Sequence, residues 1–541
     1  MLQKIVNRAS RGLRGLNNLN WYYVLGIVVI GLGIFFRFFN LDHKIYWGDE
    51  VFTSLWISGR AQADIITTLY SGQLLSHSDL QNFQTLQPGT NLVDTVRSLA
   101  KDASLITPLY HIFSRLWVVP FGDSIASVRA LSAVLSVLAL PCMYWLCIEL
   151  FQSSTVAWTA VVISAVSPWN VLFAQEARLY SLAAATILLC SACLIRATRI
   201  SSLGAWFWYS LTLALMFYSF FLSLFVAFGH GIYVYFTQKI QDGESRRTIL
   251  LYTISSLFGF LLFSPWFLII YLVKPGSQTP DEASVVPSSL SLVTVFVRLA
   301  GISSRVFFDA GLNSTDSISR IIQFTIPLLF TLVVIAYSFY FLFFGKNTTI
   351  WLFPVSLTVI VTLLHALIDV LKDYGWSFLT TPRYLVSLVL GIQISVAYLL
   401  ASKIFSSYEK RTVGWKVILC ILLSLSIASC LISSQARVWW NKGASITADD
   451  YKMSLIISQS KNSLVISDAM LWHTMSLHHM LPADTYLQLV GESLYPGKSQ
   501  NFENIFLFRP SDKLLENFAQ AGNYQMIPLY QNYLWSVQHK K

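Results

Sequence analysis

The sequence predicts a mainly α-helical, polytopic membrane protein of about eleven transmembrane helices, followed by a small α/β domain. Three observations support this fold class. Only 12% of the 541 residues are charged and 55% are hydrophobic, whereas a soluble domain carries about 25% charged residues. Apolar runs near the length of a membrane span recur along the chain. The C-terminal stretch, residues 434–541, instead has the short apolar runs that are typical of buried strands.

The apolar runs predict eleven helices. Their expected bounds are 21–39, 125–149, 154–173, 179–197, 203–218, 220–237, 248–271, 321–344, 350–368, 382–402 and 414–433. The fifth and sixth helices are separated by barely a loop, at Tyr218-Ser219-Phe220. Residues 1–433 would form the transmembrane domain, and residues 434–541 would form the small α/β domain.

The distribution of Lys and Arg predicts the sidedness. The segments that are inner if the N-terminus is cytoplasmic hold twelve basic residues, whereas the short connections on the other side hold only Arg178 and Lys372. The positive-inside rule therefore places the N-terminus in the cytoplasm. An odd number of spans then places the C-terminal domain outside, and we expect an integral protein of a bacterial inner or plasma membrane.

Two outer loops are too long to be simple connectors. The loop 40–124 contains amphipathic stretches such as Thr107–Val119, which predict helices lying along the membrane interface. The loop 272–320 contains Lys274-Pro275-Gly276 and Pro280-Asp281-Glu282, and it is typical of a mobile flap or lid. In the tail, 463–468 and 504–508 are expected to be strands, and 511–521 a helix with Ser511 as its N-cap.

Several classes of function are disfavoured by composition. The net charge of +10 follows mostly from topology in such a protein, so it does not indicate nucleic acid as a partner. All six cysteines lie within apolar segments, so neither a disulfide framework nor a zinc cluster is expected. His473, His478 and His479 cluster in the tail, but they are a weak basis for a metal site. No metal-binding residue is predicted and no cofactor is predicted; a divalent metal stays open.

Asp49 and Glu50 are the strongest catalytic candidates. They follow the first span on the predicted outer side, in Tyr46-Trp47-Gly48-Asp49-Glu50. Two carboxylates beside a bilayer are costly to bury and suited to proton transfer. A solvated loop pair is the alternative, although the flanking Trp47 and Phe52 favour a packed turn.

Further ionisable and aromatic residues gather at the same predicted membrane depth in other outer stretches. They are Tyr110 and His111 in the first outer loop, Glu176, Arg178 and Tyr180 between the third and fourth spans, and Asp369, Lys372, Asp373, Arg383 and Tyr384 around the start of the tenth span. A mixture of carboxylates with cations suits an anionic ligand and a proton acceptor. The alternatives are that Arg178 snorkels from a helix end, that Glu176 forms a surface pair with it, and that His111 is a packed polar residue.

Arg383 is singled out by its place after Pro382, a proline typical of a first helical turn. An arginine in that turn opposes the helix dipole. This placement therefore suggests an anionic partner such as a phosphate, bound between the guanidinium and the helix N-terminus.

Five motifs in order resemble the family 39-type GT-C glycosyltransferases, which include the protein O-mannosyltransferases and the bacterial aminoarabinose transferases of lipid A. The motifs are Trp47-Gly48-Asp49-Glu50, Thr107-Pro108-Leu109-Tyr110, Phe121-Gly122-Asp123-Ser124 with Arg129, Glu176-Ala177-Arg178-Leu179-Tyr180-Ser181-Leu182, and Pro382-Arg383-Tyr384-Leu385. The resemblance covers roughly residues 20–400. Each motif is weak alone, and their order on a matching topology gives them weight.

The resemblance implies transfer of a sugar from a polyprenyl-phosphate or dolichyl-phosphate donor on the non-cytoplasmic face, with inversion at the anomeric carbon. It implies Asp49 as the base and Glu50 as its support or as a contact to the acceptor. Arg178, Arg383 and Lys372 would hold the donor phosphate. Tyr110, His111, Glu176, Tyr180 and Tyr384 would line the substrate site. The partners would be the lipid-linked donor, a lipid, glycan or protein acceptor, and membrane lipids.

The chain departs from the family pattern at three places. Thr107-Pro108 stands where many members have two prolines preceded by His or Lys, which puts one phosphate contact in doubt. His111 stands where a second aromatic residue is common. Val51-Phe52 follows Asp-Glu where the aminoarabinose transferases have Arg-Tyr, which argues against lipid A modification specifically.

Two other classes of function compete with the glycosyltransferase hypothesis. A transporter or flippase of a lipid-linked substrate would show broken helices or inverted repeats with charges at mid-span, whereas the candidates cluster on one side. A non-catalytic envelope assembly protein would tolerate Asp49→Asn. The sugar and the acceptor do not follow from the sequence.

Overall fold

The computed structural model describes residues 21–240, 245–273, 292–312, 317–345, 350–371, 378–379, 381–405, 412–442, 444–491, 502–521 and 524–539. The chain divides into two compact units. We call Met1–Phe39, Ser132–Ser264 and Pro287–Gln435 the helical unit, and Asn40–Leu131, Pro265–Val286 and Ala436–Lys541 the sheet unit.

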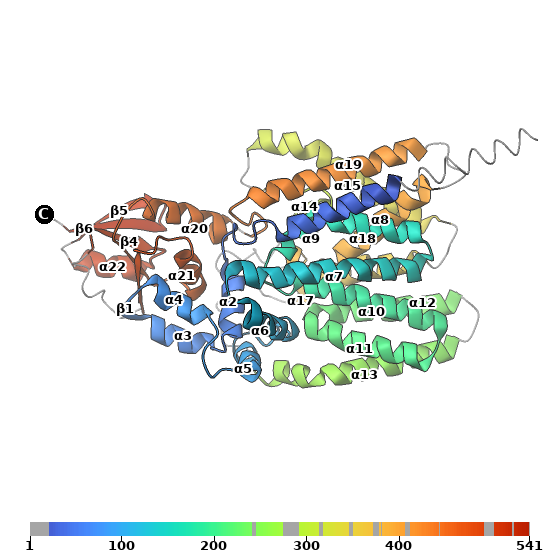
Figure 1. Cartoon of the computed structure of the whole chain (residues 1–541), viewed down its shortest axis with the longest axis horizontal. Helices are drawn as coiled ribbons and strands as arrows, with labels where there is room; N and C mark the ends of the chain where they lie inside the picture. The colour runs from blue at the N-terminus through green and yellow to red at the C-terminus, as the bar shows by residue number, and fades with distance from the viewer. Residues whose placement is uncertain are drawn as a thin grey trace, which may run out of the picture. The chain divides into compact units, whose positions relative to one another are not determined.

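Long apolar helices make up the helical unit (Figure 1). They are the first span Trp21–Phe38, α7 (Ile125–Phe151, which begins in the sheet unit), α8 (Ser154–Val166), α9 (Pro168–Ala174), α10 (Tyr180–Ile200), α11 (Leu203–Ser219), α12 (Leu224–Ile240), α13 (Ser245–Leu272, which ends in the sheet unit), α14 (Leu292–Ser304), α15 (Ile318–Phe343), α16 (Leu352–Val355), α17 (Val361–Leu371), α18 (Val386–Ile404) and α19 (Thr412–Gln435). A short 3-10 turn, Phe221–Ser223, precedes α12, and a π-helical turn, Ser356–Ile360, joins α16 to α17.

Every predicted span is helical in the structure. Within the described residues, nine helices are long and apolar enough to cross a membrane, and a tenth span is formed if the bent pair α8 and α9 counts as one. The remaining predicted segment is α11, of 17 residues. The extended backbone of Phe220 (φ −158°, ψ 113°) separates α11 from the turn that follows. The protein is therefore an integral membrane protein of the predicted class.

The structure corrects two details of the helical prediction. The expected single helix 154–173 is broken into α8 and α9, which meet at an angle of 57°, because Pro168 has no amide hydrogen to continue the helix. The loop 272–320 contains the helix α14, which the sequence analysis did not predict. The two motifs that suggested a lid, at 274–276 and 280–282, lie outside the described residues.

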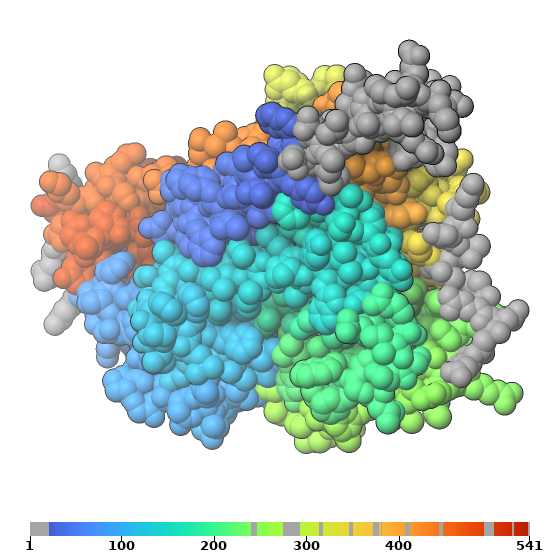
Figure 2. Space-filling model, turned by 45° about the vertical axis from the view of Figure 1, so that its right-hand side comes forward, coloured from blue at the N-terminus to red at the C-terminus, as the bar shows by residue number. Residues whose placement is uncertain are grey.

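Close packing within the helical unit depends on small residues at helix contacts. A Cβ on Gly259 of α13 would lie 2.9 Å from the carbonyl oxygen of Ser210 in α11. A Cβ on Gly391 of α18 would lie 2.2 Å from Cγ2 of Thr358. Backbones can approach this closely only where a side chain is missing, as is common between membrane helices. Figure 2 shows the side chains of the green segments, which include α11 and α13, as one continuous surface.

The sheet unit contains the helices of the first long loop and a six-stranded sheet. The helices from the loop are α2 (Gly48–Ile57), α3 (Gln62–Leu69), α4 (His77–Gln84), α5 (Leu92–Ala103) and α6 (Leu109–Phe121). The C-terminal stretch adds α20 (Ala444–Ile457), α21 (Leu471–His478) and α22 (Asp512–Gln520). The strands are β1 (Ser71–Leu75), β2 (Ser463–Ser467), β3 (Tyr486–Val490), β4 (Asn504–Phe508), β5 (Tyr524–Tyr530) and β6 (Leu534–His539).

The sheet has the order β1-β3-β2-β4-β6-β5. Its centre is parallel, with β2 between β3 and β4, in the register Leu464 opposite Ile505. Every residue of β2 is buried, as expected for a parallel strand covered on both faces. The predicted strands at 463 and 504 are present, and Ser511 is the N-cap of α22, accepting a bond of 3.2 Å from the amide of Leu514.

The first long loop also contributes to this sheet. Strand β1 pairs antiparallel with β3, with Ser71 opposite Val490. The side chain of Gln488 in β3 also donates a bond of 2.7 Å to the carbonyl of Gly72. The loop that carries Asp49 and the C-terminal stretch are therefore parts of one folded unit.

Candidate functional site

Asp49 and Glu50 lie in the first turn of α2. Trp47 is the N-cap, and its amide donates a bond of 3.4 Å to the Glu50 carboxylate three residues later. Asp49 is half-buried, and Glu50 is fully buried. Negative side chains are favourable at a helix N-terminus, because unbonded amides there carry partial positive charge. The structure thus contains the packed turn rather than the solvated loop.

Glu50 forms a bidentate ion pair with Arg129 of α7. Nε of Arg129 lies 2.8 Å from Oε1 of Glu50, and Nη2 lies 2.7 Å from Oε2. Both side chains have no exposed surface. A pair buried so completely is stable only when its remaining donors are satisfied.

Arg129 satisfies that condition with three backbone carbonyls. Nη1 donates to Leu41 (2.6 Å) and Lys44 (2.9 Å), and Nη2 donates to Ile45 (2.8 Å). One guanidinium therefore ties Glu50 to the chain that leads into α2. From the sequence, Arg129 was expected only as part of a family motif. The sequence does contain a signal for its role: an arginine inside an otherwise apolar span needs a buried partner.

Aromatic rings surround the first turn of α2. The indole of Trp439 donates a bond of 2.8 Å to the carbonyl of Ile45. Nζ of Lys442 lies 3.9 Å from the centre of the Trp47 ring, close enough for a cation–π contact. The ring of Trp472 covers Gly48, where a Cβ would lie 2.8 Å from it. The residues before and after Asp49 are thus fixed by packing.

Tyr110 and His111 lie at the start of α6 and are fully buried. The His111 ring meets the Trp56 ring edge to face, with centroids 5.3 Å apart. The indole of Trp56 donates a bond of 2.9 Å to Asp102, whose pKa is raised by burial. These contacts place His111 against the last turns of α2, and they favour the packing alternative for this histidine.

Glu176, Arg178 and Tyr180 lie in and after the connection between α9 and α10, in the helical unit. All three are buried, with 5% of Arg178 exposed. The amide of Arg178 donates a bond of 2.7 Å to the carbonyl of Glu176, and the Arg178 carbonyl accepts a bond of 3.2 Å from Ser132. The ring of Tyr180 packs edge to face on Phe173. Arg178 therefore does not snorkel from a helix end.

Arg383 and Tyr384 form a separate 3-10 turn, Pro382–Tyr384, and α18 begins only at Val386. The prediction that Arg383 lies in the first turn of the span was wrong, because Leu385 (φ −96°, ψ 33°) interrupts the helix. The Arg383 guanidinium lies 5.4 Å from the Tyr384 ring centre. The argument from an opposed helix dipole therefore does not apply to Arg383.

Asp369 of α17 fixes the chain next to this turn. Its two carboxylate oxygens accept bonds of 2.7 and 2.8 Å from the amides of Phe378 and Leu379. The ring of Phe378 packs on Tyr384, with centroids 5.1 Å apart. Lys372 and Asp373 lie outside the described residues.

The candidates thus form two groups. The sheet unit holds Asp49, Glu50, Tyr110 and His111. The helical unit holds Glu176, Arg178, Tyr180, Arg383 and Tyr384. The first group offers a carboxylate held by an ion pair, and the second offers two arginines, of which Arg383 lies beside the Tyr384 ring.

The tail histidines separate into two environments. Nδ1 of His473 lies 2.7 Å from the buried carboxylate of Asp450, which also accepts a bond of 2.7 Å from Arg509. Burial lowers the pKa of His473, and Asp450 partly opposes this.

His478 packs on the rings of His479 and His77, and Nε2 of His479 lies 2.8 Å from Oε1 of Gln84. Burial lowers the pKa of His478 well below its usual value and lowers that of His479 to about 3, so both rings are neutral near pH 7. Among the described residues, no group of three or more His, Cys, Asp and Glu side chains has a geometry that could hold a metal ion.

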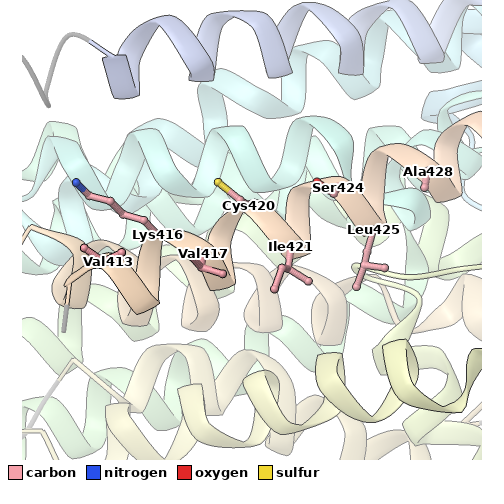
Figure 3. A pocket seen from close by; sticks show the side chains of 8 residues that line it. All are labelled: Val413, Lys416, Val417, Cys420, Ile421, Ser424, Leu425 and Ala428. Atoms are coloured by element: carbon pink, nitrogen blue, oxygen red, sulfur yellow. The ribbon is translucent and has the colours of Figure 1, made fainter.

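A cavity of about 550 Å³ lies along α19 in the helical unit. Figure 3 shows its lining, in which Lys416 and Cys420 point to one side of the helix and Ile421 and Leu425 to the other. The full lining is Val413, Lys416, Val417, Cys420, Ile421, Ser424, Leu425 and Ala428. None of these is a candidate site residue, and a mainly apolar surface on a span is what lipid chains contact.

Comparison with known proteins identifies the fold. No protein-family model matches the sequence, and no curated protein matches it. The structure of ArnT from Cupriavidus metallidurans in the apo state aligns over 96% of this chain and 98% of that chain, with a TM-score of 0.54 and 12% identity. ArnT from the same organism bound to undecaprenyl phosphate aligns over 96% and 97%, with a TM-score of 0.49 and 12% identity. AglB, an oligosaccharyltransferase from Archaeoglobus fulgidus in complex with an inhibitory peptide and a dolichol-phosphate, aligns over 96% and 74%, with a TM-score of 0.47 and 10% identity.

The whole-length match to apo ArnT shows that this chain has the GT-C fold of membrane glycosyltransferases, as the five motifs predict. The match covers both the spans and the tail, because nearly all of each chain is aligned. An identity of 12% establishes a fold and not a reaction, so the reaction is argued from the site.

Proposed function

We propose that this protein is a membrane glycosyltransferase that moves a sugar from a polyprenyl-phosphate donor to an acceptor on the extracytoplasmic face, with inversion at the anomeric carbon. The observation that carries the proposal is the buried, bidentate Glu50–Arg129 pair, because it holds the half-buried carboxylate of Asp49 in a fixed turn. The GT-C fold and the order of the five motifs support the same function.

Asp49 is the proposed base. A general base must lie within hydrogen-bond reach of the proton that it accepts, and Asp49 is the carboxylate of the first turn that keeps partial exposure. Glu50 is a positioning residue in this scheme, because both of its oxygens already bind Arg129. The family resemblance implies the same division of roles, with Glu50 as the support of Asp49 or as a contact to the acceptor.

The reaction balances without any other reactant. Asp49 accepts the proton of the acceptor nucleophile while that nucleophile forms a bond to the anomeric carbon. The bond from this carbon to the phosphate oxygen breaks, and polyprenyl phosphate leaves with the electron pair. Fixed positive charge near the departing phosphate lowers the barrier, and this is the role proposed for Arg178, Arg383 and Lys372.

The remaining candidates are proposed to contact substrate. Tyr180 follows Arg178 by two residues, and Tyr384 follows Arg383 directly. Both tyrosines have an aromatic face on which a sugar ring can pack. Glu176 precedes Arg178 by two residues. Tyr110 and His111 are buried against α2, so their contribution would be to shape the wall behind Asp49.

The proposal is tested by transfer from a radiolabelled polyprenyl-phosphate sugar in proteoliposomes that contain the purified protein and a membrane extract as acceptor source. Asp49→Asn should lower the rate by about 100-fold or more, because it removes the base but keeps the shape. Asp102→Asn is the matched control, since Asp102 is a carboxylate of the same unit that bonds Trp56 and the amide of Gln62.

Arg178→Ala and Arg383→Ala should each lower transfer by about 10-fold to 100-fold, because each removes charge from the departing phosphate. Arg320→Ala is their control, since Arg320 bonds a backbone carbonyl of the same unit and belongs to none of the motifs. Full transfer by both Asp49→Asn and Arg383→Ala would rule out the proposed mechanism.

A transporter of a lipid-linked substrate is the second candidate, because the described part of the chain includes a broken span, α8 with α9. Broken spans bind substrate in many transporters. The two functions separate in vesicles without acceptor, where a fluorescent polyprenyl-phosphate sugar would still cross the bilayer in a transporter. A glycosyltransferase would leave it in its original leaflet.

A further inference from the structure

The break between α8 and α9 leaves backbone carbonyls to be satisfied. A helix end leaves its last carbonyls without intrahelical donors. Pro168 worsens this, because the residue four positions after Ser164 has no amide hydrogen. Unbonded carbonyls inside a membrane are costly, because no water is present there to bond them. The side chains that bond these carbonyls therefore decide whether the break is stable.

Arg37, near the end of the first span, bonds two of the carbonyls. Nη1 donates to the carbonyl of Ala165, and Nη2 donates to that of Ser164 at 3.2 Å. The same guanidinium donates to Ser136 at 2.9 Å and to Gly33 at 2.8 Å. Arg37 has no exposed surface. Its fork therefore joins the first span, α7 and the end of α8.

Two other side chains complete the end of α8. Nδ2 of Asn170 donates to the Ser164 carbonyl at 3.0 Å, and Sγ of Cys430 donates to the Val166 carbonyl at 3.3 Å. The carbonyls of residues 164, 165 and 166 thus all have donors from side chains. Side chains thus stabilise the break. Of the three donors named, Arg37, Asn170 and Cys430, only Arg37 is charged.

The position of this charge is electrostatically favourable. An arginine within a span is costly, and the four groups that accept bonds from Arg37 are neutral. The C-terminal end of a helix carries partial negative charge. The end of α8 therefore compensates the guanidinium, which explains how this residue is retained in an apolar environment.

Gln175 provides the reverse half of the contact. Nε2 of Gln175 donates to the carbonyls of Phe36 at 2.7 Å and Phe39 at 3.0 Å, at the end of the first span. Arg37 from the first span thus bonds the end of α8, while Gln175 after α9 bonds the end of the first span. We call this reciprocal contact the Arg37–Gln175 clamp.

The clamp residue Gln175 directly precedes a stretch that holds candidate site residues. Gln175 is followed directly by Glu176, Ala177 and Arg178. We propose that the Arg37–Gln175 clamp fixes the connection 175–179 and thereby holds Arg178 in place for an anionic ligand. Arg37 and Gln175 are positioning residues that act through Arg178. This inference rests on the phosphate-binding role of Arg178 under the proposed function, and its first test does not.

The first test is amide hydrogen exchange in the purified protein in nanodiscs. Arg37→Met and Gln175→Leu should each speed exchange in peptides that cover 175–180, because each opens one half of the clamp. Arg115→Met is the matched control, since Arg115 is a buried arginine of the sheet unit that bonds the carbonyls of Ile57 and Thr90. Unchanged exchange at 175–180 in both clamp variants would overturn the inference. Gln175→Leu keeps the test valid if Arg37→Met fails to fold.

The second test measures binding of undecaprenyl phosphate to the same nanodiscs. Arg37→Met, Gln175→Leu and Arg178→Ala should each raise the Kd by about 10-fold, equivalent to about 1.4 kcal/mol. The double variant Arg37→Met/Arg178→Ala should bind no more weakly than Arg178→Ala alone, because the clamp acts through Arg178. If the losses of affinity in the double variant are additive, the clamp does not act through Arg178. If Arg178→Ala binds normally while exchange is faster in the clamp variants, the clamp stands and the phosphate role of Arg178 fails.

Discussion

The first turn of α2 and the break between α8 and α9 each depend on one fully buried arginine, but the two guanidiniums have different partners. Arg129 pairs with the carboxylate of Glu50 and also bonds three carbonyls. Arg37 bonds three carbonyls and a hydroxyl, all neutral. In both regions the five-donor fork of arginine joins segments that are distant in the sequence. The difference lies in what remains when the arginine is lost.

Without Arg129, a charged carboxylate is left buried, whereas without Arg37 only neutral acceptors are left. Breaking a buried ion pair costs about 3–5 kcal/mol, and leaving a neutral polar group unbonded costs about 1–3 kcal/mol. We therefore expect Arg129→Met and Arg37→Met to lower the free energy of unfolding by different amounts, although both replace a buried arginine with methionine. Both regions stand next to a candidate site residue, Asp49 in one and Arg178 in the other.

The largest effect is expected for Arg129→Met, which should lower the free energy of unfolding by about 3–5 kcal/mol. Arg37→Met should lower it by about 1–3 kcal/mol. Denaturant titration in mixed micelles measures both. The double variant Glu50→Gln/Arg129→Met should be more stable than Arg129→Met, because it removes the unpaired charge. Equal losses of unfolding free energy in Arg37→Met and Arg129→Met would contradict the expected difference between the two arginines.

A second contrast concerns a glycine in each region. A Cβ on Gly33 would lie 2.2 Å from the carbonyl oxygen of Ala165, and a Cβ on Gly48 would lie 2.8 Å from the ring of Trp472. Backbone yields less than a side chain, so Gly33→Ala should cost more than Gly48→Ala, with overpacking costs of about 1–3 kcal/mol. The midpoint temperatures of the two variants rank them, and the reverse order would contradict this account.

The last prediction is a pH dependence that belongs to the sheet unit. The folded pKa of His479 is lowered to about 3 and that of His478 is also lowered, by burial among His77, Gln84, Tyr46 and Arg129. The unfolded chain therefore binds more protons than the folded chain between about pH 3 and 6.5. The contribution of these histidines to the free energy of unfolding is fully present above pH 6.5. It falls as the pH is lowered, by up to about 1.4 kcal/mol per pH unit for each histidine.

The variant His479→Gln should flatten this slope between pH 7 and 5, because it removes one of the groups that take up protons on unfolding. His43→Gln, at a histidine outside the cluster, is the control. Unfolding midpoints at a series of pH values give the result. A slope that is the same in His479→Gln and in the unaltered protein would assign the pH dependence to other groups.

The spans could be predicted from the sequence because hydrophobicity along a helix is a local property. All eleven predicted segments are helical, including 203–218 and 220–237, which were separated by little more than Phe220. The bend at Pro168 was also encoded locally, but the continuous apolar run hid it. The N-cap Ser511 was found for the same local reason, since a serine before an amphipathic stretch bonds the next turn.

The pairings within the candidate site could not be predicted in this way. Glu50 and Arg129 are 79 positions apart, and only the packing of α2 against α7 brings their side chains together. Arg383 was placed in the first turn of a helix because proline usually begins one, but Leu385 interrupts the backbone after Tyr384. The edge strand β1 contains Gly72 and has an exposed face, so no period-2 pattern marked it.

The sequence by itself determined the membrane class, the positions of the spans, the tail strands β2 and β4 and the order of motifs that resemble GT-C enzymes, because each of these depends on neighbouring residues. Only the tertiary structure decided that Glu50 is held by Arg129, that Arg37 and Gln175 close the break before Arg178, and that the first long loop joins the tail in one sheet. Those contacts exist because buried charges and unbonded carbonyls must find partners, and the partners that they find are set by the folded chain.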